Sequence, residues 1–133
     1  TMKVRTIKEI TNTDRHVHGE GFESLRLILA KDEMGFSVHK TIIPQGPPRH
    51  WHYTHHLEAC YCVQGWGELT NLRTGEVFTI VPDTIYILDN HDDHTFQAIS
   101  DTILISIFNP PVTGREIHNE DGSYTPANLI QNF

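Results

Sequence analysis

The sequence predicts an all-β domain, a sandwich or barrel of short strands with at most one or two short helices. Three observations favour it: sustained helical periodicity is hard to find, short strand-like segments follow one another, and turn-forming residues separate them. Strands that recur about every 8–12 residues are typical of sandwiches and barrels. The expected strands are Ser24–Ala30, Gly35–Ile43, Leu57–Gln64, Gly67–Asn71, Val77–Val81, Thr84–Asp89, His94–Ile99 and Thr102–Phe108.

A short helix is expected before the strands, and a tail is expected after them. In Thr6–Thr13, Ile7 and Ile10 are three residues apart and would share one face of a helix. Turn residues such as Lys31-Asp32 punctuate the strands. The end of the chain, 119–133, is mostly polar and is expected to be a surface tail. With 133 residues there is room for one domain and one modest core, so residues 1–133 are predicted to form a single unit.

Charge and composition exclude several classes of function. There are 17 acidic and 10 basic side chains, and no cluster of Lys and Arg could follow a phosphate backbone, so nucleic acid is not an expected partner. No apolar run approaches the roughly 20 residues that span a membrane. The first residues carry no apolar signal core. Cys60 and Cys62 would share a face of one strand, in poor geometry to bond each other, so reduced thiols and a cytoplasmic location are expected.

Side-chain alternation places polar residues together on single strand faces. Ser37, His39 and Thr41 share one face, and Glu58 points the same way as Cys60 and Cys62. An ordinary sandwich would turn such polar faces to water. A small barrel that holds a ligand can instead line its interior with them, and alternation alone leaves both readings open.

The spacing of a few residues resembles the first cupin motif. Gly46, His52, Glu58 and Gly65 follow one another at the motif's intervals, but Thr54 stands where a second histidine is expected. The resemblance implies a cupin fold, that is, a small double-stranded β-helix or jelly-roll barrel. The common site of three histidines and one glutamate cannot be assembled from this pattern.

The second cupin motif, a proline, a glycine and a histidine, is blurred in this chain. Pro82 is present, but Asp83-Thr84 stands where the glycine is expected, and Tyr86 lies near the histidine position. The ligand set therefore differs from the usual one, while the fold expectation is unaffected.

Longer strings resemble one family of cupins, the ectoine synthases. The segments DEMGFSVHKTII, HYTHHLEACYCVQGWGE, TIYILDNHDDH and FNPPVTGREIHNEDGSY occur in the family's order and spacing, within Gly21–Tyr124. The resemblance implies a hydro-lyase, a homodimer whose iron site closes N-γ-acetyl-L-2,4-diaminobutyrate into ectoine with release of water. An iron cupin dioxygenase and a non-catalytic cupin that binds a small molecule are the alternative functions.

The family's metal-ligand positions fall on Glu58, Tyr86 and His94. Carboxylate and phenolate oxygens are hard donors and imidazole suits several metals, so Fe(II) is expected, with Zn(II) or Mn(II) as alternatives. Apart from the resemblance, Glu58 among apolar neighbours already suggests a ligand, because a buried unpaired carboxylate is costly. Tyr86 alone would be read as core, and His52 is a reserve ligand.

The resemblance also implies the residues around the substrate. Tyr53 and Glu116 are candidates for proton handling; Thr41, His56, Phe108 and His118 match positions that line or close the pocket. Arg26 is added from charge alone, because guanidinium matches a carboxylate in two-pronged fashion.

Four positions depart from the family's motifs. Phe22, an expected substrate contact, replaces a tryptophan, Ser106 a cysteine, Asp83 a glycine, and Cys60 an aliphatic residue. Either the substrate preference has drifted or these changes are neutral.

Overall fold

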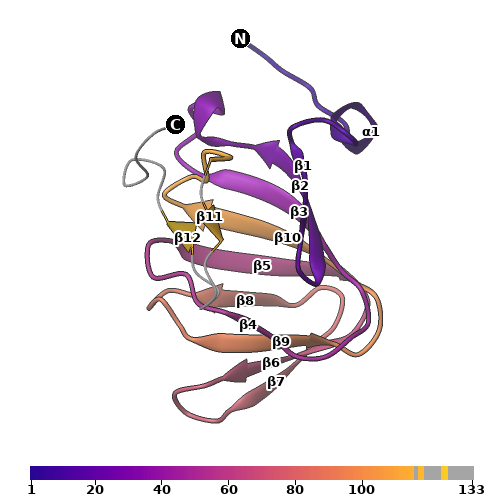
Figure 1. The fold of residues 1–133 in the computed structure, drawn as a ribbon, viewed down its shortest axis with the longest axis vertical. Helices are drawn as coiled ribbons and strands as arrows, with labels where there is room; N and C mark the ends of the chain where they lie inside the picture. The colour runs from indigo at the N-terminus through magenta and orange to yellow at the C-terminus, as the bar shows by residue number, and fades with distance from the viewer. Residues whose placement is uncertain (116, 119–123, 126–133) are drawn as a thin grey trace.

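The chain folds into two antiparallel sheets, which Figure 1 shows stacked along the long axis of the molecule. This computed structural model describes residues 1–115, 117–118 and 124–125. The larger sheet has the order β1-β2-β3-β10-β5-β8 and the smaller one the order β4-β9-β6-β7. The larger sheet comprises β1 (His16–Gly19), β2 (Phe22–Ile28), β3 (Ser37–Ile43), β10 (Thr102–Asn109), β5 (Leu57–Gln64) and β8 (Ile85–Leu88). The smaller comprises β4 (Arg49–Trp51), β9 (His94–Ala98), β6 (Gly67–Asn71) and β7 (Val77–Ile80).

All eight predicted strands are present, with ends that differ by up to two residues. Two strands of the sheets were not predicted, β1 and β4. Each is at most four residues long and carries no run of apolar alternation, so the sequence offers no signal for either. A further pair, β11 (Ile117–His118) and β12 (Tyr124–Thr125), forms a small sheet of its own. The rest of the predicted tail, 119–123 and 126–133, lies outside the described residues.

Helices are minor elements, as the sequence predicts. The expected helix is a single turn, α1 (Ile7–Ile10), whose N-cap Thr6 side chain accepts a hydrogen bond from the Glu9 amide. A second turn, the 3-10 helix η1 (Ala30–Asp32), replaces the loop expected there. No helix among the described residues has the length and apolar character needed to cross a membrane.

Asp32 fastens the N-terminal segment to the larger sheet. Its carboxylate accepts hydrogen bonds from Arg5, Arg15 and the Leu29 amide. Burial alone would raise the pKa of Asp32, but these donors lower it from 3.8 to about 2. Next to it, the Ala30 amide donates to the Val112 carbonyl at 2.9 Å, so the same corner holds the chain that follows β10.

The second glycine of the cupin motif is required by a tight turn. Gly65 has φ 96°, in the left-handed region that favours glycine. A Cβ there would lie 2.3 Å from the Asp101 carbonyl oxygen. Gly65 therefore lets β5 turn into β6 against the loop before β10.

The polar faces identified by alternation are turned inward. On β5, Glu58, Cys60 and Cys62 are buried while Tyr61 and Val63 are exposed. Ser37 and His39 on β3 are likewise buried, and Ser106 lies between Leu104 and Phe108 on the inner face of β10. The interior-lined barrel is thus the confirmed alternative. Both cysteines are unpaired.

Candidate active site

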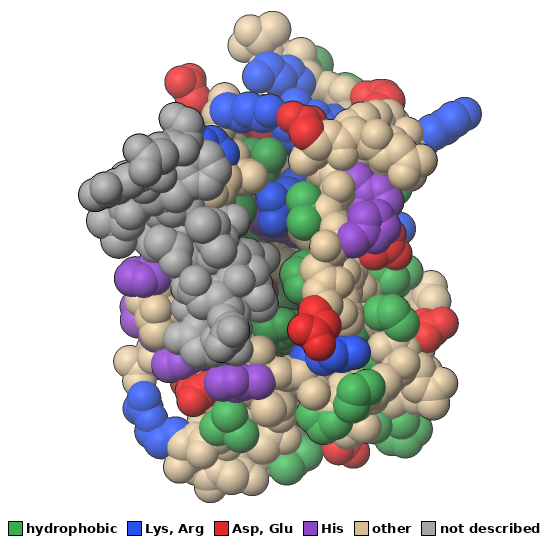
Figure 2. All heavy atoms as spheres, viewed as in Figure 1, with side chains coloured by type: hydrophobic (Ala, Val, Ile, Leu, Met, Phe, Trp, Pro, Cys, Tyr) green, Lys and Arg blue, Asp and Glu red, His purple; other side chains and the backbone are tan. Residues whose placement is uncertain are grey.

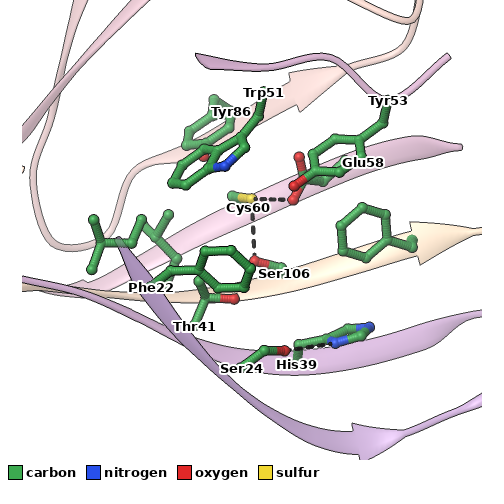
Figure 3. Close-up of a pocket in the computed structure, with 13 residues that line it drawn as sticks. Phe22, Ser24, His39, Thr41, Trp51, Tyr53, Glu58, Cys60, Tyr86 and Ser106 are labelled. Carbon is green, nitrogen blue, oxygen red and sulfur yellow. Dashed lines mark hydrogen bonds between the residues drawn. The ribbon is translucent and has the colours of Figure 1, made fainter. Parts of the chain in front are cut away.

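A cavity of about 30 Å³, partly open to solvent, lies inside the barrel. Its walls come mainly from the inner face of the larger sheet, and Trp51 of β4, in the smaller sheet, adds to them (Figure 3). Figure 2 shows the visible face of the molecule hollowed near its centre, with hydrophobic side chains around the hollow. The lining residues are Phe22, Ser24, His39, Thr41, Ile43, Trp51, Tyr53, Glu58, Cys60, Tyr86, Leu104, Ser106 and Phe108.

Glu58 is a buried carboxyl with no basic side chain beside it among the described residues. It lies on β5 between Phe108 of β10 and Leu88 of β8 in the strand register. The one hydrogen bond that it makes among the described residues is accepted by its Oε2 from the Cys60 thiol, at 3.3 Å. Burial raises the pKa of Glu58 from 4.5 to about 8, against a small lowering by Cys60. A cation bound in the cavity would favour the ionised carboxylate and so lower the pKa of Glu58.

Tyr86 lines the same cavity one strand away. It pairs with Cys60 in the β5–β8 register and stacks on Phe96 of β9, with ring centroids 6.2 Å apart. Burial raises the pKa of the Tyr86 phenol well above its ordinary value, and the nearby Cys60 and Glu58 raise it further. The phenol therefore stays protonated unless a cation binds to its oxygen.

His94 has one ring nitrogen engaged and the other bare. Its Nδ1 donates to the Asp92 carbonyl at 2.9 Å, while Nε2 is buried without a hydrogen-bond partner among the described residues. Burial lowers the pKa of His94, although Asp92 and Asp93 oppose this. A neutral imidazole oriented through Nδ1 with a free Nε2 lone pair is the arrangement of a metal-ligating histidine.

The three predicted ligands are positioned unequally. Glu58 and Tyr86 line the cavity together, whereas His94 is not among its lining residues. His94 lies beyond Tyr53, with ring centroids 6.5 Å apart, and pairs with Trp51 across β9 and β4. A carboxyl, a phenol and a bare imidazole nitrogen, all buried, fit a divalent metal by donor type.

Of the residues predicted to bind the substrate or handle protons, only some line the cavity. Phe22, Thr41, Tyr53 and Phe108 line the cavity. The Tyr53 and His56 rings both meet Phe108 edge-on, with centroids 5.2 and 5.9 Å away, and His56 is buried but does not line the cavity.

Arg26 does not line the cavity. It is buried on β2, two residues from Ser24 on the same inward face, and its Nε has no hydrogen-bond partner among the residues the structure describes. Glu116 lies outside the described residues, and of His118 only the backbone, in β11, is described.

Seven lining residues were not predicted as site residues: Ser24, His39, Ile43, Trp51, Cys60, Leu104 and Ser106. All but Trp51 share strand faces with predicted ones, so alternation carried the signal once the inward face was known. The Thr41 and Ser106 hydroxyls are 2.9 Å apart, and Cys60 Sγ lies 3.5 Å from Ser106 Oγ. Two departures from the family's motifs, Cys60 and Ser106, therefore contact each other at the cavity wall. Asp83, in contrast, is exposed on a turn with φ 68°.

The histidine-rich run does not form a cluster of ligands. His50 pairs with Asp93, and His52 Nε2 lies 2.9 Å from the His91 carbonyl, to which it donates. His55 is exposed and His56 is buried. The reserve ligand His52 is thus engaged elsewhere.

In the part of the chain that the structure describes, one group of histidine and acidic side chains has metal-ligand spacing. His16, His18 and Glu23 on the β1–β2 hairpin have ligand atoms within 4.8 Å of one another. However, the Asn12 amide donates to His16 Nδ1 at 3.1 Å, so Nε2 carries the hydrogen and donates to Glu23 at 2.8 Å. A metal at Nε2 would displace that hydrogen onto Nδ1, against the Asn12 N–H. This cluster is a hydrogen-bonded surface group.

Comparison with known proteins decides the family. The family model for ectoine synthase matches residues 2–128. The chain belongs to the ectoine synthase family. It is 48% identical over 126 residues to the L-ectoine synthase of Mycobacteroides abscessus, covering 95% of this chain and 97% of that protein.

Solved structures agree with this assignment. The crystal structure of an ectoine synthase from P. lautus superposes with a TM-score of 0.85 at 37% identity, covering 99% of this chain and 96% of that one. A cupin domain of a transcriptional regulator from Enterobacter cloacae, 18% identical, gives a TM-score of 0.56 over 68% of this chain and 98% of that one, and shows the shared cupin fold alone. The predicted fold and family are both confirmed.

Proposed function

We propose that this chain is an L-ectoine synthase, a hydro-lyase that cyclises N-γ-acetyl-L-2,4-diaminobutyrate to ectoine and water. The family match over residues 2–128 carries the proposal. The cavity supports it, because a few polar groups converge in a pocket whose walls are mainly apolar.

We propose that Glu58, Tyr86 and His94 hold a divalent metal, Fe(II) first, with Zn(II) or Mn(II) as alternatives. The uncompensated Glu58 carboxyl and the bare Nε2 of His94 support this donor set. When bound there, the metal supplies a Lewis acid for the acetamide oxygen, because an amide is otherwise a poor electrophile.

The reaction joins two ends of one molecule. The substrate's neutral α-amine attacks its own acetamide carbon, a C–N bond forms, and the carbonyl oxygen leaves as water with two hydrogens from the nitrogens. Folding the substrate into its near-ring shape lowers the barrier, because the attack is intramolecular. Phe22, Trp51 and Phe108 supply the apolar walls that favour this folded shape and exclude water.

Proton handling and polar recognition are assigned to the remaining predicted residues. Tyr53 lies beside Glu58 at the cavity (Figure 3), which supports its role in moving a proton at the reacting nitrogen. Glu116, outside the described residues, is proposed as the base that accepts the amine proton. Thr41, His56 and His118 are proposed to hold the substrate's polar ends.

Arg26 is proposed to pair with the substrate carboxylate. Its buried Nε, which lacks a partner among the described residues, supports this assignment.

Anaerobic incubation of iron-loaded protein with N-γ-acetyl-L-2,4-diaminobutyrate tests the activity, and ectoine formation is the expected result. Glu58→Ala is expected to purify folded but nearly metal-free and inactive. Glu20→Gln, at a side chain that is 94% exposed, is the control and should retain metal and activity. No ectoine from metal-replete wild type would contradict the proposal. Oxygen uptake in air would favour the dioxygenase, and binding without turnover the non-catalytic cupin.

We also propose a cytoplasmic homodimer. The outer face of β5 and β8 exposes Tyr61, Val63, Ile85 and Ile87, a contiguous apolar surface of the kind that marks protein interfaces. A second copy would also cover β8, an edge strand of the larger sheet. The two free cysteines support a reducing compartment. Light scattering should give twice the chain mass for wild type and the single mass for Ile87→Lys; a wild-type monomer would contradict the dimer.

A further inference from the structure

A hydrogen-bonded row of side chains leads from the backbone after β10 to the cavity. The Val112 amide donates to Ser37 Oγ at 2.9 Å. Ser37 Oγ lies 3.0 Å from His39 Nε2, and His39 Nδ1 lies 3.1 Å from Ser24 Oγ. Ser24 and His39 line the cavity, whereas Ser37 does not (Figure 3).

Hydrogen positions in this row follow from counting donors and acceptors. Ser37 is fully buried and already accepts the Val112 N–H, so its own hydroxyl hydrogen needs an acceptor. His39 Nε2 is the one available acceptor among the described residues. If Nε2 carried the hydrogen instead, the Ser37 hydroxyl would be sealed in the interior with no acceptor, which is costly. His39 therefore carries its hydrogen on Nδ1.

The tautomer of His39 sets how Ser24 can hydrogen-bond to a ligand in the cavity. With Nδ1–H donating to Ser24 Oγ, the Ser24 hydroxyl hydrogen is left without an acceptor in the described protein and points to the cavity. In the opposite arrangement Ser24 would donate to His39, and would offer the cavity only lone pairs. The tautomer of His39 thus decides whether Ser24 has a hydrogen to donate to a ligand in the cavity.

The row is held neutral and rigid. Burial, and then the charges of Arg26 and His56, lower the pKa of His39 to about 3, so the ring does not gain a second proton near neutral pH. The Val112 peptide is fixed on both sides, because its carbonyl accepts from the Ala30 amide. Phe108 meets the His39 ring edge-on at 5.2 Å.

We propose that His39 is a positioning residue that, as its neutral Nδ1–H tautomer, fixes Ser24 as a hydrogen-bond donor to an oxygen of the ligand in the cavity. Resting on the proposed function, this deepens it by naming the group that takes the Ser24 hydrogen: a carboxylate or carbonyl oxygen of the ligand rather than its ammonium group. An ammonium group has no acceptor to offer the Ser24 hydroxyl.

The tautomer is measured directly by 15N NMR of the imidazole rings in zinc-loaded protein, which is diamagnetic. The His39 signals are assigned by their loss in His39→Asn. We expect Nδ1 to carry the hydrogen at neutral pH. A hydrogen on Nε2, or a doubly protonated ring, would overturn the proposal. Because this spectrum needs no turnover, it stays decisive even if the protein makes no ectoine.

Kinetics test the role of the row in substrate binding. His39→Leu removes the donor to Ser24 and should raise KM about tenfold with kcat within about twofold, as expected for a lost hydrogen bond to a ligand oxygen. Ser24→Ala should give the same rise, and the double variant no further rise. His39→Asn keeps an N–H near the Nδ1 position and should recover most of the affinity. A folded His39→Leu with unchanged KM, or equal losses in Asn and Leu variants, would contradict the role; if His39→Leu does not fold, Ser24→Ala decides.

Discussion

The pKa of Glu58 predicts an unusual dependence of stability on pH in metal-free protein. Its carboxyl has an ordinary pKa of 4.5 and a folded-state pKa raised to about 8. Between these values the folded protein keeps a proton that the unfolded chain loses, so stability falls as pH rises through this window. Each tenfold change in proton affinity is worth about 1.36 kcal/mol, so the full effect is at most about 5 kcal/mol.

The perturbation that isolates this effect is Glu58→Gln, a neutral side chain of the same shape. Chelator-treated wild type and variant are unfolded with urea at a series of pH values. Buried histidines act in the opposite sense: the lowered pKa of His39 adds stability as pH rises toward 6.5. That contribution is common to both proteins, so the difference between the two curves reports Glu58.

As the pH rises from 4.5 to 8, we expect the free energy of unfolding of the variant to exceed that of wild type by a growing margin that reaches several kcal/mol. Below pH 4.5 the two should differ little. Glu20→Gln, at a side chain that is 94% exposed, should show no such gain and is the matched control. A metal that binds Glu58 should restore wild-type stability at pH 8 and leave the variant unchanged. Parallel curves for wild type and Glu58→Gln would refute the reasoning.

Three further predictions concern other parts of the fold. Asp32→Asn should lower the free energy of unfolding at pH 7 by about 1–2 kcal/mol. Since the pKa of Asp32 is lowered from 3.8 to about 2, the difference in free energy of unfolding between wild type and variant should shrink as the pH falls from 4 to 2. A difference that persists below pH 2 would contradict this prediction. Metal analysis should give one ion per chain, unchanged in His16→Ala; loss of an ion in that variant would reinstate the surface cluster. Asp83 has a left-handed backbone, so Asp83→Gly should leave thermal stability nearly unchanged, because relief of backbone strain offsets the hydrogen bond lost from Tyr61. Asp83→Val should lower the free energy of unfolding by about 1–2 kcal/mol. Equal effects of the two substitutions would contradict this.

Local pattern was enough to predict the strands with strong alternation. The bounds of Leu57–Gln64 and Gly67–Asn71 agree with the structure, because their apolar faces and flanking turns are encoded in adjacent residues. The three-residue strand β4 carries no such pattern. It exists because Trp51 pairs with His94, a partner 43 positions along the chain.

For the site, too, local pattern predicted some features and left others to the tertiary structure. Alternation grouped Glu58 with Cys60 and placed His39 among polar residues, but it left open which face was inside. Only the closed barrel answers that: Glu58, Cys60 and Cys62 are buried inside it, and Tyr61 and Val63 are exposed.

The sequence by itself determined the all-β class, the family and the candidate ligands, because these depend on residue types at fixed spacing. Tertiary structure decided the rest: the bare Nε2 of His94, the meeting of Cys60 with Ser106, and the row from Val112 to Ser24. These features join residues up to 75 positions apart, through hydrogen bonds that no local pattern encodes.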